Sequence, residues 1–141
     1  MLDGPQYGDV RASVRVKLVD GRRSAGLVWR YQDPENYYLA WLDLGEQRVG
    51  AYRFTRGNRI RIRSEDDLEL DPNAWHALKV AHEGGTIKIY LGGIKVVDVR
   101  DRTFREPGGV GLWSTGDSVA YFDDFRVEEG HHDRRHEASR R

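Results

Sequence analysis

Two tryptophans and two arginines have the side-chain types that bind saccharides. Trp41, Trp113, Arg30 and Arg53 all lie in segments rich in aromatic and β-branched residues. Tryptophan rings stack on the C–H faces of sugars, and arginine directs several donors at hydroxyl or carboxylate oxygens. Arg30 and Arg53 can share a surface with Trp41, whereas Trp113 fits equally well as a side chain that covers the core. These four residues form the candidate ligand site.

A run of alternating carboxylates is a second candidate for chemistry. Asp67, Glu69 and Asp71 occupy every other position, and alternate strand residues can place two carboxyl groups about 5 Å apart, the separation used in retaining glycoside hydrolysis. No aromatic residue is interleaved with them, so we interpret the run as a solvated acidic loop. His76 shares a face with Leu78 and is interpreted as a packed core histidine. No catalytic triad or glycine-rich phosphate motif stands out, and no catalytic residue is assigned.

Asp123 is the candidate metal ligand. Period-two alternation in the last predicted strand places it on the same face as Tyr121, Phe125 and Val127. A carboxylate on an apolar face requires a cation or hydrogen-bond donors. One interpretation is a structural calcium ion held with loop carbonyls. The other is that Asp123 accepts backbone N–H bonds from a neighbouring turn, which is the commoner use of such a group.

Length and charge limit the partners of the chain. Its 141 residues suffice for one domain with a real core, and 23 basic residues balance 23 acidic ones. This balance lacks the basic excess of a nucleic-acid binder, and it favours a solvated strand face over an anion-binding stripe for Arg59, Arg61 and Arg63. There is no cysteine, no apolar run of membrane-spanning length, and no signal peptide in Met1–Pro5. We expect neither nucleic-acid binding nor membrane insertion.

Apolar residues recur with a period of two almost throughout, which is typical of strands. Turn residues such as Asp33–Pro34 and Gly84–Gly85 separate ten short segments. Strands are expected at about 8–19, 24–32, 36–43, 47–55, 58–64, 74–83, 85–91, 94–100, 110–113 and 118–128. This spacing predicts an all-β, antiparallel two-sheet sandwich. The side chains expected inside are Val14, Val16, Leu18, Leu78, Val80, Ile87, Ile89, Phe125 and Val127.

The last residues differ from the rest in composition. Residues 129–141 contain three histidines and four arginines and almost nothing apolar, too little to repay the entropy of ordering. We therefore predict one folded domain over residues 1–128 and a disordered charged tail over 129–141. Histidines in a flexible segment bind metals weakly, because the site is not preorganised.

Five segments carry a resemblance to a known family. They are Gly26–Leu39 (GLVWRYQDPENYYL), Trp75–Val80 (WHALKV), Ile87–Gly93 (IKIYLGG), Gly109–Trp113 (GVGLW) and Tyr121–Val127 (YFDDFRV). In order and spacing the chain resembles the concanavalin A-like lectin/glucanase superfamily. Within it, the chain is most similar to the laminin-G-like group that includes the bacterial 3-keto-disaccharide hydrolase domain family. The resemblance implies a jelly-roll sandwich.

The resemblance also bears on function. The resembling domains often have arginine at the position of Trp41, which implies that this side chain faces outward on the concave sheet. The leading interpretation is a non-catalytic module that binds a glycan there. The alternatives are a glycoside hydrolase of the 3-keto-disaccharide hydrolase type and a structural or adhesion module that binds protein through a sheet edge. An extracellular or periplasmic location is favoured by the resemblance alone.

One departure from the resembling domains concerns the last strand. Those domains usually begin well upstream, with additional strands that pair with the final one. Either a minimal sandwich closes without them, or the chain is a piece of a longer one, or a partner supplies the missing edge beside the strand at 118–128. Such an edge invites another chain to pair, so we expect a homodimer.

Overall fold

The described part of the chain consists of β-strands. In a computed structural model, residues 4–20, 24–116 and 119–130 are described. The strands are β1 (Val10–Asp20), β2 (Ser24–Asp33), β3 (Asn36–Asp43), β4 (Arg48–Thr55), β5 (Asn58–Glu65), β6 (Trp75–Glu83), β7 (Thr86–Leu91), β8 (Ile94–Arg100), β9 (Gly109–Ser114) and β10 (Val119–Glu129). Within these ranges, no helix is long and apolar enough to cross a membrane. The ten predicted strands are confirmed, with small shifts at their ends.

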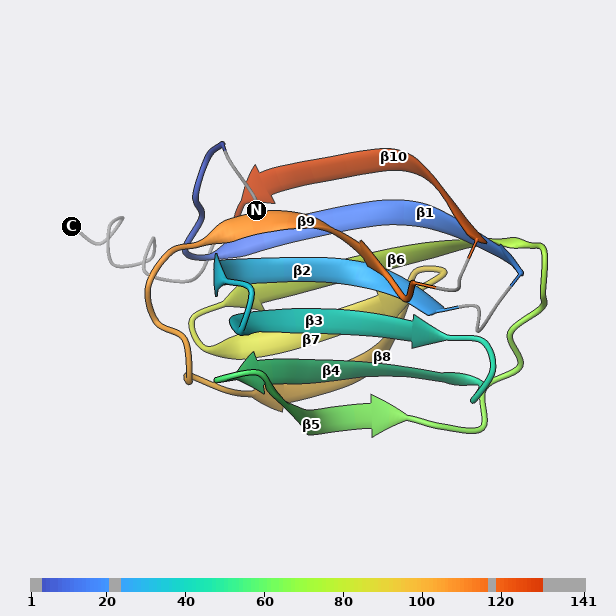
Figure 1. The fold of residues 1–141 in the computed structure, drawn as a ribbon, viewed down its shortest axis with the longest axis horizontal. Coiled ribbons are helices and arrows are strands. Elements are labelled where there is room, and N and C mark those ends of the chain that lie inside the picture. Colours follow the sequence, from blue (N-terminus) through green and yellow to red (C-terminus); the bar gives the residue numbers. More distant parts are fainter. Residues whose placement is uncertain (1–3, 21–23, 117–118, 131–141) are drawn as a thin grey trace.

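The strands form two antiparallel five-stranded sheets. One has the order β10-β1-β6-β7-β8, and the other has the order β5-β4-β3-β2-β9. Figure 1 shows the sheets as two layers, with β2 to β5 lying in front of β6 to β8. The predicted all-β sandwich is therefore confirmed, and each sheet has one face toward its neighbour and one face away from it.

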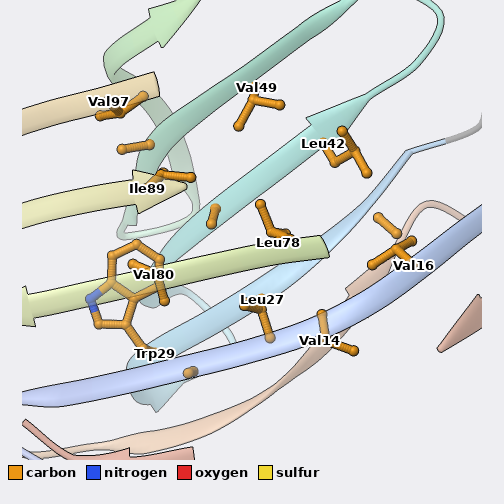
Figure 2. Packing of buried hydrophobic residues seen from close by; sticks show 14 of the residues in the cluster. Val14, Val16, Leu27, Trp29, Leu42, Val49, Leu78, Val80, Ile89 and Val97 are labelled. Atoms are coloured by element: carbon orange, nitrogen blue, oxygen red, sulfur yellow. The ribbon is translucent and has the colours of Figure 1, made fainter. Parts of the chain in front are cut away.

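The core lies between the two layers, where the inward side chains of both sheets meet. Figure 2 shows Val14, Leu78 and Val80 facing Leu27 and Trp29 across this space. Seven of the nine side chains predicted inside are at most 2% exposed: Val14, Val16, Leu18, Leu78, Val80, Ile87 and Ile89. Burial of this apolar surface is the main driving force for bringing the layers together.

The last strand departs from the predicted alternation. Phe125 is 41% exposed, so its assignment to the core is wrong. Arg15 pairs with Asp123 while Ser13 pairs with Arg126, so two residues of β10 lie opposite Val14 in a β-bulge. The bulge reverses the pattern, so that Phe122 packs on the core before it and Val127 after it.

β10 is also an edge strand, as the sequence suggested. It pairs with β1 on one side and has no partner strand on the other among the described residues. The bulge and the charged side chains of Asp123, Asp124 and Arg126 are devices that natural sheets use to discourage edge pairing. Whether the chain forms a homodimer stays a prediction. Glu129 belongs to β10, whereas the rest of the predicted tail, from residue 131 on, lies outside the described residues.

A buried hydrogen bond connects the two sheets. Trp29 Nε1 of β2 donates to His82 Nδ1 of β6 at 2.9 Å, and both side chains are fully buried. The Trp29 ring stacks on Tyr38 with centroids 5.3 Å apart. Burial, reinforced by the charge of Arg30, lowers the pKa of His82 to about 4. The imidazole must remain neutral to accept the bond from Trp29, because a protonated ring offers only donors.

This burial predicts a specific acid sensitivity. His82 takes up its proton near pH 6.5 in the unfolded chain but only near pH 4 in the folded one, so stability falls as the pH decreases through this window. At about 1.4 kcal/mol per pKa unit, the loss reaches about 3 kcal/mol below pH 4. Guanidinium denaturation followed by tryptophan fluorescence at pH 4 to 7 measures it.

Substitutions separate this effect from the carboxylates that titrate in the same range. In His82→Gln the decline should be smaller than in the wild type, since no imidazole remains to be charged. His76→Gln is the matched control, because the His76 ring is partly exposed and hydrogen-bonded to the Asp71 carbonyl group. Equal declines in the wild type and His82→Gln would contradict the assignment.

Candidate functional site

The outward face of the β5-β4-β3-β2-β9 sheet carries a second apolar cluster. Its buried members are Val28, Tyr37, Leu39 and Tyr52, and its half-buried members are Tyr31, Trp41, Phe54 and Trp113. The opposite side chains of β3, Tyr38, Ala40 and Leu42, are fully buried in the core. Trp41 therefore faces outward, as the resemblance implied.

Two glycines make room for the tryptophans. Across the sheet, Trp113 pairs with Gly26, Gly26 with Trp41, and Trp41 with Gly50. A Cβ atom at Gly26 would collide with the Ala40 carbonyl oxygen, and one at Gly50 would lie 2.9 Å from the Tyr52 ring. Glycine inside a strand often marks such a close approach. The Trp41 ring can therefore lie 5.1 Å from both the Trp113 ring and the Tyr52 ring.

A cleft of about 810 Å³ opens beside Trp41. This volume lies within the usual range of small-ligand sites. Loop residues between β3 and β4 form one wall, and the edge strand β5 contributes another. The lining residues are Ser24, Trp41, Asp43, Gly45, Glu46, Arg48, Tyr52, Arg59, Arg61 and Thr115.

Two donors in this cleft lack protein partners. The Arg59 guanidinium lies 4.9 Å from the centre of the Trp41 ring and makes no hydrogen bond or ion pair with the described residues. Trp41 Nε1 is buried and has no acceptor among them. Unpaired buried donors are rare and costly. The exposed Arg59 guanidinium is open to the oxygen atoms of a ligand, whereas Trp41 Nε1 is enclosed by the protein.

The other charged groups of the cleft are already engaged. Arg48 donates to Asp66 at 2.8 Å, and this hydrogen bond lowers the pKa of Asp66 below its ordinary value. Asp43 accepts the backbone N–H of Glu46 at 3.1 Å, which closes the turn between β3 and β4. Arg61 lies 3.4 Å from the Ser64 hydroxyl group. Arg59 is thus the arginine of this cleft best able to bind a ligand.

Arg30 does not lie beside Trp41, and the predicted placement on that surface is wrong. Its φ of 48° and the register shift after Trp29 mark a bulge in β2. The bulge turns the side chain inward, where it is 7% exposed. There it donates to the carbonyl oxygens of Phe104 at 2.7 Å and Gly8 at 3.2 Å, and it pairs with Asp9. Arg30 therefore ties three segments of the chain together.

Arg53 is also absent from the Trp41 surface. It follows Val49 and Ala51 on the inward face of β4, whereas Gly50 and Tyr52 face outward. Its Nη1 donates to Asp101 at 2.8 Å. Burial alone would raise the pKa of Asp101, but hydrogen bonds from Tyr38 and Thr103 outweigh it and lower that pKa. This network closes one end of the sandwich.

Asp123 is not a buried carboxylate, so the reason for expecting calcium there is removed. The β10 bulge places it on the outward face opposite Arg15, with its side chain 58% exposed. It lies 3.6 Å from Arg15 and accepts the Asp124 backbone N–H. No group of three or more acidic, histidine or cysteine side chains that could hold a metal ion occurs within the described ranges. The tail histidines lie outside them.

The structure therefore places Trp41 and Trp113 side by side, but neither Arg30 nor Arg53 lies on the same surface. Asp67, Glu69 and Asp71 lie in the loop after β5, as expected. Sequence reasoning set Arg59 and Arg61 aside as a solvated strand face and overlooked Asp43, Glu46 and Arg48. The strand glycines Gly26 and Gly50 were the available sequence signal for this site, because they alternate with Trp113 and Trp41 across the sheet.

The comparisons agree with this fold. The sequence model described as 3-keto-alpha-glucoside-1,2-lyase-like domain matches residues 1–128, and the chain belongs to this family. The carbohydrate binding module CBM66 from Bacillus subtilis is 28% identical, with a TM-score of 0.84 over 91% of this chain and 80% of that one. No curated protein matches significantly.

Galectins share the fold at much lower identity. CG-16, a homodimeric agglutinin from chicken liver, is 8% identical and superposes with a TM-score of 0.69 over 90% of this chain and 97% of that one. Galectin LEC-6 from Caenorhabditis elegans is 13% identical, with a TM-score of 0.66 over 92% and 89% of the two chains. These likenesses concern the architecture alone.

The position of Arg30 predicts a structural role. Arg30→Met keeps most of the side-chain length but leaves the Phe104 and Gly8 carbonyls and the Asp9 carboxylate without this donor. Since unsatisfied buried groups cost about 1–3 kcal/mol each, we expect a loss of about 2–4 kcal/mol in the free energy of unfolding. Chemical denaturation at neutral pH measures it.

Arg59→Met is the matched control, because Arg59 contacts the rest of the protein mainly through the Trp41 ring. It should cost at most about 1 kcal/mol, the scale of an exposed cation–π contact. If the two variants were equally stable, the structural role of Arg30 would be refuted.

Proposed function

We propose that this chain is a non-catalytic module that binds a saccharide in the cleft beside Trp41. The observation that carries the proposal is the union of packed aromatic rings with the Arg59 guanidinium, which has no hydrogen-bond or ion-pair partner among the described residues. Sugars present flat C–H faces and many acceptor oxygens, so rings and donors together match their chemistry. The similarity to a carbohydrate binding module supports the same function.

The binding mode follows from the packing around Trp41. Its ring is held by Tyr52 and Trp113, which limits its freedom before the ligand arrives. A preorganised platform loses little conformational entropy on binding. Arg59 lies over the Trp41 ring with its donors available to sugar hydroxyl groups, while Ser24 and Thr115 line the other side of the cleft.

Replacement of Trp41 tests the proposal. Trp41→Ala should weaken saccharide binding by about 1–3 kcal/mol, the usual loss for a large aromatic anchor. A glycan array identifies the ligand, and isothermal titration calorimetry with that glycan measures the loss. Tyr121→Ala is the control, because Tyr121 is 54% exposed on the other sheet and should not affect this affinity.

A second pair of variants tests the donor. Arg59→Met retains the aliphatic stem over the ring but removes the guanidinium, so affinity should fall by about threefold to tenfold, the worth of a net hydrogen bond. Arg63→Met, in the same strand but outside the cleft lining, should bind as the wild type does. A blank array for the wild type, or unchanged affinity in Trp41→Ala, would end the proposal.

An enzymatic role is the second candidate, since the family is described as lyase-like. The cleft contains two carboxylates, Asp43 and Glu46, beside Arg59 and Arg61. A carboxylate can act as a general base and arginines can stabilise a developing negative charge. Against this role, Asp43 is engaged in the β3–β4 turn and Glu46 is 64% exposed.

Activity assays distinguish the two candidates. Incubation of the wild type with 3-keto-α-glucosides, followed by chromatography of the products, should show no turnover if the module only binds. Turnover that falls by about 100-fold or more in Asp43→Asn or Glu46→Gln, the scale of a lost general base, would establish the enzyme instead.

A further inference from the structure

The outward face of the other sheet contains a groove that is separate from the Trp41 cleft. The register places Ser13 of β1 beside Lys79 of β6, and Lys79 beside Tyr90 of β7. On its other side, Ser13 pairs with Arg126 of β10. The neighbouring row joins Arg15 with Ala77. A hollow of about 470 Å³ opens over these rows.

Small residues form the floor of this groove and long ones its sides. Ser13 and Ala77 stand where larger outward side chains would fill the space. Lys79 and Tyr90 line one side, and Arg15 and Arg126 line the other. An extended chain can therefore lie against the sheet between two rows of functional groups.

The charge of the groove favours an anion. Its lining contains three cations, Arg15, Lys79 and Arg126, against the single carboxylate of Asp124. Lys79 has no carboxylate partner among the described residues. Arg15 lies 3.6 Å from Asp123 and 3.9 Å from Asp124, and Arg126 lies 3.8 Å from Asp124; such long, exposed pairs contribute little energy. A ligand carboxylate can replace them, and arginine binds carboxylates through two parallel hydrogen bonds.

Aromatic rings accompany these cations. Lys79 Nζ lies 5.4 Å from the centre of the Tyr90 ring. Next to the groove, the 40% exposed Trp75 has the Arg15 guanidinium 4.9 Å and the Lys17 ammonium 5.9 Å from its ring centre. An aromatic ring beside a cation can bind a ligand that has both an apolar C–H face, which packs on the ring, and a negative charge, which pairs with the cation.

We propose that this groove binds a uronate unit of an acidic polysaccharide. The carboxylate would lie between Arg126 and Lys79, and the C–H face of the sugar would contact Tyr90. An acidic peptide would satisfy the cations but has no flat C–H face for the ring. The groove and the Trp41 cleft lie on opposite faces of the sandwich, so the module can contact two saccharide chains, and this site does not depend on the Trp41 cleft having a ligand.

Titration of the whole chain with a galacturonate oligosaccharide tests the proposal. Amide chemical shifts should change at Ser13, Ala77 and Tyr90, and Lys79→Gln/Arg126→Gln should weaken binding by about tenfold or more, as expected for the loss of two charge-assisted contacts. Both side chains are exposed, so the variant should fold with the wild-type Tm. Tyr90→Leu, which removes only the ring, should weaken binding by about threefold or more.

Control variants locate the ligand. Lys88→Gln removes a cation from the same sheet outside the groove lining, and Trp41→Ala alters the other cleft; both should bind as the wild type does. No shift changes in the wild type would overturn the proposal, as would binding that is lost in Trp41→Ala but retained in the double variant. Equal competition by polyglutamate would show an acidic-peptide site, and a preference for dextran sulfate would refute the carboxylate assignment.

Discussion

The sandwich depends on the interaction between Trp29 and His82, which joins its two layers. Each layer presents aliphatic side chains to the other, and such contacts alone tolerate sliding, because dispersion forces are not directional. The hydrogen bond from Trp29 Nε1 to His82 Nδ1 is directional and buried, so it fixes β2 against β6. Tyr38 stacks on Trp29 and donates to Asp101 at 2.6 Å, which extends the same network to the segment after β8.

With the inner faces fixed, the outer faces are free to acquire function. Leu39 and Val28 are buried although they face away from the core, because the aromatic rings of the outward cluster cover them. Tyr37 stacks between Tyr31 and Phe54, with centroid distances of 5.5 and 4.7 Å. These rings stabilise the sheet, whereas Trp41 combines this role with a place in the lining of the cleft. The aromatic packing that stabilises this face thus also fixes the position of Trp41 at the candidate site.

Much of this architecture follows from period-two alternation, and two of the misplaced residues share one physical cause. Alternation correctly predicts the strands and the inward residues of β1 and β6, and the family resemblance implied the outward direction of Trp41. Arg30 and Phe125 were misplaced because a β-bulge lies at or beside each of them, and a bulge shifts every later side chain to the other face. Bulges depend on the partner strand, so local sequence does not reveal them. Arg53 is different, since its spacing from Ala51 already indicated the inward face.

The two bulges also explain where polar groups gather. At Arg30 the bulge places a buried guanidinium within hydrogen-bond distance of the Gly8 and Phe104 carbonyl oxygens. These bonds hold the two segments against β2. In β10 the bulge at Asp124, where φ is 55°, lets Phe122 and Val127 both reach the core while the charged residues between them face outward. The bulge in β2 therefore stabilises the fold, and the bulge in β10 places polar side chains on the outward surface beside β1. Regular pairing would have placed Arg30 on the outward aromatic cluster, away from Gly8 and Phe104, and Asp123 in the core, where an unpaired carboxylate costs free energy.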